Sequence, residues 1–347
     1  MRGIPGMRSA HLQVMLALVA IFCVNWGAAA AQELPTHVST LDSKNIHVLH
    51  VRGNVYMLVE PTTNVTVQIG EQYVIVVDPG VAALGDELVS LIRSLSSLPI
   101  MFIPNTSSDK DHVEADLILS QAGWALPNAG YTGLTPDVAD AVVNHVSLAP
   151  GATVMGHANT INRMNEMMGK LATSAITFGH EGFKLYNNEP VIFQYLPAAH
   201  SDGDTLVFFR SSDVISVGGL LSTISYPVIE SERGGTIDGF IDALNAIINI
   251  TVPHESEEGG TYVIPGHGHL CDRNDVVDYR DMVTIIRGRI QFMIKKGMTL
   301  EQVKAAKPTF DYDPLYGAKT GPWTTDMFIE AMYRNLSKGK TMQGEKH

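Results

Sequence analysis

The chain has 347 residues, of which 45% are hydrophobic and 17% charged, and its formal net charge is −12. A chain of this length and hydrophobicity buries a sizeable core, which excludes intrinsic disorder. The negative charge argues against a nucleic-acid binder, because phosphate binding requires clustered lysines and arginines. The two cysteines, Cys23 and Cys271, exclude a disulfide scaffold and a zinc site of the CxxC type.

The first 31 residues have the pattern of a secretory signal peptide. Arg2 and Arg8 precede an apolar run over residues 14–24, and Ala29 and Ala31 provide a small-residue cleavage site. The apolar run is shorter than the about 20 residues that a transmembrane helix needs. We therefore expect a periplasmic or secreted protein whose mature part, residues 32–347, has no membrane span.

Strands and helices alternate along the mature chain, which predicts one layered α/β domain. Period-2 alternation and apolar runs predict strands, and apolar residues at helical spacing predict helices. The expected strands cover residues 47–59, 65–69, 72–78, 99–104, 184–187, 214–221 and 261–266, together with a hairpin-like stretch over residues 190–210 that contains the loop around His200. The expected helices cover residues 82–97, 114–123, 158–172, 236–248, 275–297 and 323–337, and the last two close the domain. The segment 124–151 is irregular and is expected to cover one face.

Loops that follow the predicted strands carry side chains of the metal-ligand type. In chain order these are Asp109, Asp111, His112, His200, Asp202, Asp204, His267 and His269. Loops on a rigid scaffold are where such residues converge. Histidine with carboxylate suits zinc, and also iron or manganese. We expect Asp202 and Asp204 to be turn residues, His269 to be a loop residue and Cys271 to be a buried thiol.

These loops resemble the signature motifs of the metallo-β-lactamase-fold superfamily over about residues 45–340. Residues 105–112 read NTSSDKDH, where the family has N-T-H-x-H-x-D-H. Asp78 matches the family's strand-end aspartate, His200 in PAAHSDGD its third-motif histidine, and His267 in VIPGHG its last histidine. The resemblance implies an α/β fold in a four-layer αββα sandwich, with Asp78 supporting the metal loop by hydrogen bonds rather than by coordination.

The sequence departs from the family pattern at the first metal position. Ser107 and Asp109 replace two histidines, and Gly219 falls where two-metal members have a bridging aspartate. Only His200 remains there, with Asp109 as a candidate substitute ligand. The resemblance assigns the second metal position to Asp111, His112 and His267, all of which are present.

Two functions follow from this pattern. The first is an exported metal-dependent hydrolase of a small ester, lactone or amide, with β-lactams suggested by family and compartment alone. One ion, zinc or else iron or manganese, would bind Asp111, His112 and His267 beside His200, and Asp109 together with Asp111 would serve catalysis. The alternative is a binding protein that kept the fold and lost the metal centre, which the replaced ligands favour.

Overall fold

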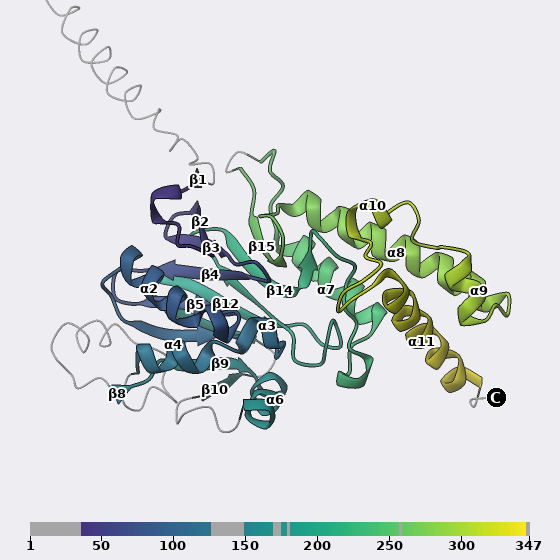
Figure 1. Ribbon diagram of the computed structural model, residues 1–347, viewed down its shortest axis with the longest axis horizontal. Helices are drawn as coiled ribbons and strands as arrows, with labels where there is room; N and C mark the ends of the chain where they lie inside the picture. Colours follow the sequence, from purple (N-terminus) through teal and green to yellow (C-terminus); the bar gives the residue numbers. More distant parts are fainter. Residues whose placement is uncertain (1–35, 126–148, 169–174, 179–180, 257–258, 345–347) are drawn as a thin grey trace, which may run out of the picture. The chain divides into compact units, whose positions relative to one another are not determined.

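The computed structural model describes residues 36–125, 149–168, 175–178, 181–256 and 259–344 (Figure 1). The predicted signal peptide lies outside these residues, as do most of the irregular segment 124–151 and the end of the predicted helix 158–172. Within the described ranges, no helix has the length and apolar character needed to cross a membrane.

The first sheet has eight strands in the order β1-β2-β3-β4-β5-β6-β9-β10. Neighbours from β1 to β5 pair antiparallel, whereas β5, β6, β9 and β10 pair in parallel. The strands are β1 (Thr36–His37), β2 (His47–Arg52), β3 (Val55–Val59), β4 (Asn64–Ile69), β5 (Val74–Val77), β6 (Ile100–Pro104), β9 (Thr153–His157) and β10 (Ala175–Phe178).

Parallel neighbours need crossover connections, and helices supply them here. The helical elements of this half of the chain are η1 (Ser39–Leu41), η2 (Ala82–Leu84), α2 (Gly85–Leu95), α3 (Lys110–Val113), α4 (Asp116–Ala122) and α6 (Ala158–Met168). A separate two-stranded sheet pairs β7 (Trp124–Ala125) with β8 (Ala149–Pro150).

The second sheet has five strands in the order β11-β12-β13-β14-β15. They are β11 (Glu181–Tyr186), β12 (Glu189–Tyr195), β13 (Thr205–Phe209), β14 (Val214–Ser222) and β15 (Tyr262–His267). The first four pair antiparallel, and β14 pairs in parallel with β15. The helices of this half are η3 (Ser231–Arg233), α7 (Ile237–Ile250), α8 (Arg273–Lys295), α9 (Leu300–Ala305), α10 (Asp313–Tyr316) and α11 (Thr325–Gly344).

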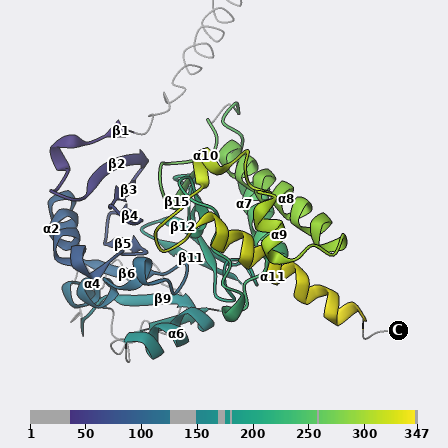
Figure 2. The same cartoon turned by 45° about the vertical axis from the view of Figure 1, so that its right-hand side comes forward.

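Three buried clusters give the domain its four layers. One lies between the two sheets and includes Met57, Val77, Phe193 and Val214. A second packs α2, α4 and α6 on the outer face of the first sheet, and a third packs α7, α8 and α11 on the second sheet. The two helix groups lie on opposite sides of the paired sheets (Figure 2). The predicted αββα sandwich is therefore confirmed.

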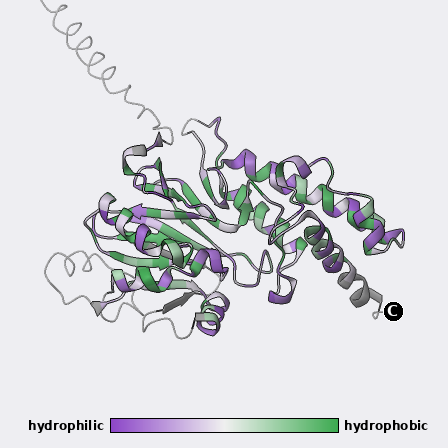
Figure 3. Ribbon diagram, viewed as in Figure 1, coloured by the Kyte–Doolittle hydropathy of each residue, from purple (hydrophilic) through white to green (hydrophobic). Residues whose placement is uncertain are grey.

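The hydropathy of each element explains its layer. The strands are mostly hydrophobic, whereas the helices alternate hydrophobic and hydrophilic residues (Figure 3). In α7, Phe240, Leu244 and Ile247 recur at helical spacing and are all buried. Helix α8 begins before the predicted residue 275 because Asp272 forms a capping box with Asp275 at its start.

Candidate metal centre

The residues of the motif converge where the strands of both sheets end. Asp78 follows β5 and is held at a positive φ of 52°, a backbone conformation that non-glycine residues rarely adopt. Its Oδ1 accepts a hydrogen bond of 2.8 Å from the Thr106 backbone N–H, and its Oδ2 accepts one of 2.6 Å from the Thr106 hydroxyl. These bonds fix the start of the loop after β6, which carries the next motif residues.

Asp111, His112 and His267 form one compact group. Each offers a ligand atom, and these atoms all lie within 4.8 Å of one another. His267 Nε2 lies 3.6 Å from Asp111 Oδ2, and the rings of His112 and His267 are 5.4 Å apart, edge to face. Asp111 is 39% exposed at its side chain, so this side of the group is open to solvent.

Two hydrogen-bonding observations indicate that this group fits a cation. His267 Nδ1 donates 2.7 Å to the Thr62 carbonyl, which leaves the lone pair of Nε2 facing Asp111. His112 is fully buried, and neither of its ring nitrogens has a hydrogen-bond partner. Its Nδ1 lies 3.3 Å from Asp78 Oδ2, without hydrogen-bond geometry. The Asp78 carboxylate thus faces Nδ1, whereas Nε2 is buried with no partner, which is costly unless a cation or a ligand satisfies it.

The β3–β4 hairpin holds the His267 loop in place. The Thr63 hydroxyl donates 3.1 Å to the Gly266 carbonyl, and the Asn64 amide donates 2.9 Å to the Pro265 carbonyl. A Cβ at Gly266 would lie 2.9 Å from His112 Cε1, so only glycine permits this approach of the two loops. Sequence reasoning missed this support, because the hairpin carries no metal-ligand motif.

Asp109, His200 and Glu230 form a second group, whose ligand atoms also lie within 4.8 Å of one another. His200 Nε2 lies 3.5 Å from Asp109 Oδ2, and His200 Nδ1 lies 3.3 Å from Asp204 Oδ1. Asp204 is buried and also accepts hydrogen bonds from the backbone N–H and the hydroxyl of Ser201. Asp204 is therefore a turn residue, as predicted, and its contact with His200 gives it a second role that sequence reasoning missed.

Arg233 completes this second group. Its Nη1 lies 3.1 Å from Glu230 Oε2 and 3.9 Å from Asp109 Oδ1. Neither Glu230 nor Arg233 belongs to a recognisable motif, and both were missed by sequence reasoning. The only available signal was the charged stretch at residues 230–233 between two predicted elements.

Charge compensation shapes the pKa values of both groups. Burial alone would lower the pKa of His200 and of His112. The carboxylates of Asp109 and Asp204 instead raise it to about 10 for His200, and Asp78 raises it to about 9 for His112. Burial would raise the pKa of Asp109, but the charges of His200 and His112 hold it below its usual range. Both groups are thus polar clusters in which opposite charges face each other.

Comparisons with known proteins place this architecture. No protein-family model matches the sequence, and no curated protein matches it. Among solved structures, the stereoselective inverting sec-alkylsulfatase Pisa1 from Pseudomonas sp. is similar with a TM-score of 0.57 at 13% identity, over 83% of this chain and 49% of that chain. The DIM-1 metallo-β-lactamase is similar with a TM-score of 0.51 at 14% identity, over 70% of this chain and 99% of that chain.

This chain has the metallo-β-lactamase fold. The resemblance inferred from the motifs is confirmed at the level of the fold. The chain spans about half the length of the alkylsulfatase, at 49%. The similarity therefore concerns only one part of that enzyme.

Ser107 and Gly219, two positions at which the sequence departs from the motif, both lie next to Asp109. Ser107, at the first replaced histidine, is buried and accepts a 3.2 Å hydrogen bond from the Asp109 backbone N–H. A Cβ at Gly219, the replaced aspartate, would lie 3.3 Å from Asp109 Oδ2. The Asp109 carboxylate therefore lies directly beside the position from which the missing bridging aspartate would extend.

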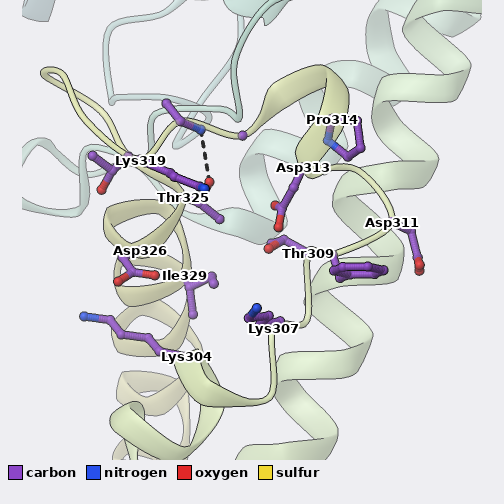
Figure 4. A pocket seen from close by; sticks show the side chains of 14 residues that line it. Lys304, Lys307, Thr309, Asp311, Asp313, Pro314, Lys319, Thr325, Asp326 and Ile329 are labelled. Atoms are coloured by element: carbon purple, nitrogen blue, oxygen red, sulfur yellow. Dashed lines mark hydrogen bonds between the residues drawn. The ribbon is translucent and has the colours of Figure 1, made fainter.

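Two cavities differ in their relation to these groups. One of about 730 Å³, among α9, α10 and α11, is lined by residues such as Lys307, Thr309 and Asp326 and by none of the motif residues (Figure 4). Another of about 480 Å³ is lined by His267 and by apolar residues that include Met57 and Leu270. Despite its smaller volume, the second cavity is the better candidate for substrate binding, because His267 of the metal-ligand group lines it.

Proposed function

We propose that this protein is an exported metal-dependent hydrolase with one divalent ion, zinc in the first instance, on Asp111, His112 and His267. The observation that carries the proposal is the state of the two histidines. The buried His112 ring has Asp78 beside its Nδ1 and no partner at Nε2, and the His267 ring is held by a backbone carbonyl so that its Nε2 faces a carboxylate. Two imidazoles, a carboxylate and an open side are the donor set of a catalytic zinc site. Export is supported by the signal-peptide pattern of residues 1–31.

The roles of the chain's own residues follow from their positions. Asp111, His112 and His267 would hold the ion, which would supply Lewis acidity and lower the pKa of a water molecule at neutral pH. Asp78 holds the metal loop through Thr106, and the Thr62 carbonyl fixes the tautomer of His267. Asp109, placed between His200 and Arg233, accepts a hydrogen bond from the attacking water and orients it.

The proposed substrate is a small ester, lactone or amide that reaches the site through the apolar cavity beside His267. The apolar lining favours an acyl or alkyl group next to the scissile bond. β-Lactams and alkyl sulfate esters belong in the first screen, since the similar structures are named as a β-lactamase and an alkylsulfatase.

Metal content tests the proposal directly. The exported chain, dialysed against buffer with trace zinc, should hold metal by plasma mass spectrometry, and an Asp111→Ala/His267→Ala double variant should lose it. His269→Ala is the matched control, because His269 lines the same cavity but lies outside the metal-ligand group. The same three proteins are then assayed on esters, lactones, β-lactams and alkyl sulfates. A wild-type chain that binds neither zinc, iron nor manganese would overturn the proposal and favour a binding protein on this fold.

A further inference from the structure

The group at Asp109, His200 and Glu230 has the donors of a second cation site, but a cation from the protein is already bound there. The Arg233 guanidinium contacts Glu230 at 3.1 Å and approaches Asp109 to 3.9 Å. On the far side of Asp109, His200 Nε2 lies at 3.5 Å. Asp109 thus lies between two basic side chains. These side chains compensate the negative charge of its carboxylate, a role that a metal ion would otherwise fill.

The main chain of Arg233 is tied to the loop that carries His200. The Arg233 carbonyl accepts a 2.9 Å hydrogen bond from the Asp202 backbone N–H, and the Glu230 backbone N–H donates 2.9 Å to the His200 carbonyl. Gly234 follows at a φ of 82°, where an added Cβ would collide with Asp202. These contacts hold residues 230–234 against the His200 loop, so the fold fixes the backbone from which the Arg233 side chain extends.

The guanidinium lies beside Asp109, one of the positions at which the sequence departs from the family motif. Asp109 stands where the family has a histidine, and its Oδ2 lies 3.3 Å from a Cβ built on Gly219, where two-metal members have the bridging aspartate. A guanidinium keeps its charge at every physiological pH, unlike an imidazole. A dication entering the group would have to displace Arg233 from Glu230 and would meet its positive charge at close range.

We propose that Arg233 takes the place of the first metal ion, so that the centre combines one ion at Asp111, His112 and His267 with a fixed guanidinium at Asp109, His200 and Glu230. The side chain of Arg233 is 38% exposed, and within the described residues Glu230 is its one hydrogen-bond acceptor. Its remaining N–H groups have no acceptor among the described residues, so they are available to bind an oxyanion of the substrate or one that develops during hydrolysis. This inference rests on the proposed function. It adds that Arg233 makes the substrate-binding side of the centre a site for an anionic group.

The test is to vacate the guanidinium position and count ions. Arg233→Met removes the guanidinium and keeps most of the apolar stem, whereas Arg233→Lys retains the charge. Arg334→Ala is the matched control, because Arg334 lines the same cavity of about 640 Å³ as Arg233 but pairs with Glu330 instead. Each exported protein is loaded with Zn²⁺ and counted by plasma mass spectrometry, titrated with Co²⁺ by absorbance, and checked for folding by circular dichroism.

We expect one ion in the wild type, in Arg233→Lys and in Arg334→Ala, and two ions in Arg233→Met. Adding Glu230→Gln to Arg233→Met should return the count to one, because it removes a donor of the vacated group. Two ions in the wild type, or one ion in a folded Arg233→Met variant, would overturn the inference and still leave a metal-dependent hydrolase. No ion in the wild type would instead defeat the proposed function itself, so the two failures are distinguishable.

Discussion

The buried carboxyl group of Glu60 makes stability depend on pH in a way that one substitution can isolate. Glu60 follows β3 and is 5% exposed, with its carboxylate packed on Gly80 in the loop that leads from Asp78. Neither carboxylate oxygen has a partner with hydrogen-bond geometry. Burial raises the pKa of Glu60 to about 7, although the nearby Val81 backbone N–H opposes the rise. The group therefore favours its neutral form in the folded protein.

The size of the effect follows from that pKa. A rise from 4.5 to about 7 corresponds to about 3 kcal/mol between the two protonation states. Because the folded state binds this proton more tightly than the unfolded state, the contribution is fully present below about pH 4.5 and is lost as the pH rises through about 7. Little discount for solvent screening applies, since the side chain is almost fully buried.

Urea unfolding of the metal-free chain at pH 4.5 and pH 8 measures this contribution. Glu60→Gln cannot ionise, so the difference in unfolding free energy between variant and wild type should increase by about 3 kcal/mol from the lower to the higher pH. Glu71→Gln is the control, because Glu71 is exposed and its removal should leave the pH dependence unchanged. A difference for Glu60→Gln that stays constant across this range would refute the reasoning.

Three further predictions concern Asp78, two glycines in contrasting surroundings, and stabilisation by zinc. Asp78→Asn should weaken zinc affinity by about 10- to 100-fold in chelator competition, since outer-shell partners of ligating histidines have effects of this order; an unchanged affinity would deny Asp78 that role. Gly218→Ala should cost more than about 2 kcal/mol in thermal unfolding, because φ is 50° and the new Cβ collides with Thr106. Gly288→Ala, in open space on α8, should instead be neutral or stabilise by up to about 1 kcal/mol, and equal effects at both glycines would contradict this account. Saturating zinc at about 100 times its Kd should stabilise the wild type by about 2.7 kcal/mol, and EDTA should abolish that gain; a melting temperature that ignores both additions would argue against metal binding to the folded state.

Much of the fold could be predicted from the sequence because its signals are local. Alternation and apolar runs marked most strands of both sheets, although not β1, β9 or β10, and helical spacing marked α2, α7 and α8. Asp111, His112 and His267 could be grouped in advance because each follows a strand within a short motif whose order along the chain is characteristic. The structure brings these three side chains together as the motif implied.

The rest of the site depends on contacts between loops that no local pattern encodes. Glu230 reaches His200 because a backbone hydrogen bond ties two loops 30 positions apart, and Arg233 follows from the same connection. Asp204 has the sequence context of a turn residue, and only its burial against His200 shows its role as a support. Short-range periodicity and motif order specify elements and ligands, whereas the charges that surround those ligands depend on how distant loops pack, which is a property of the assembled tertiary structure.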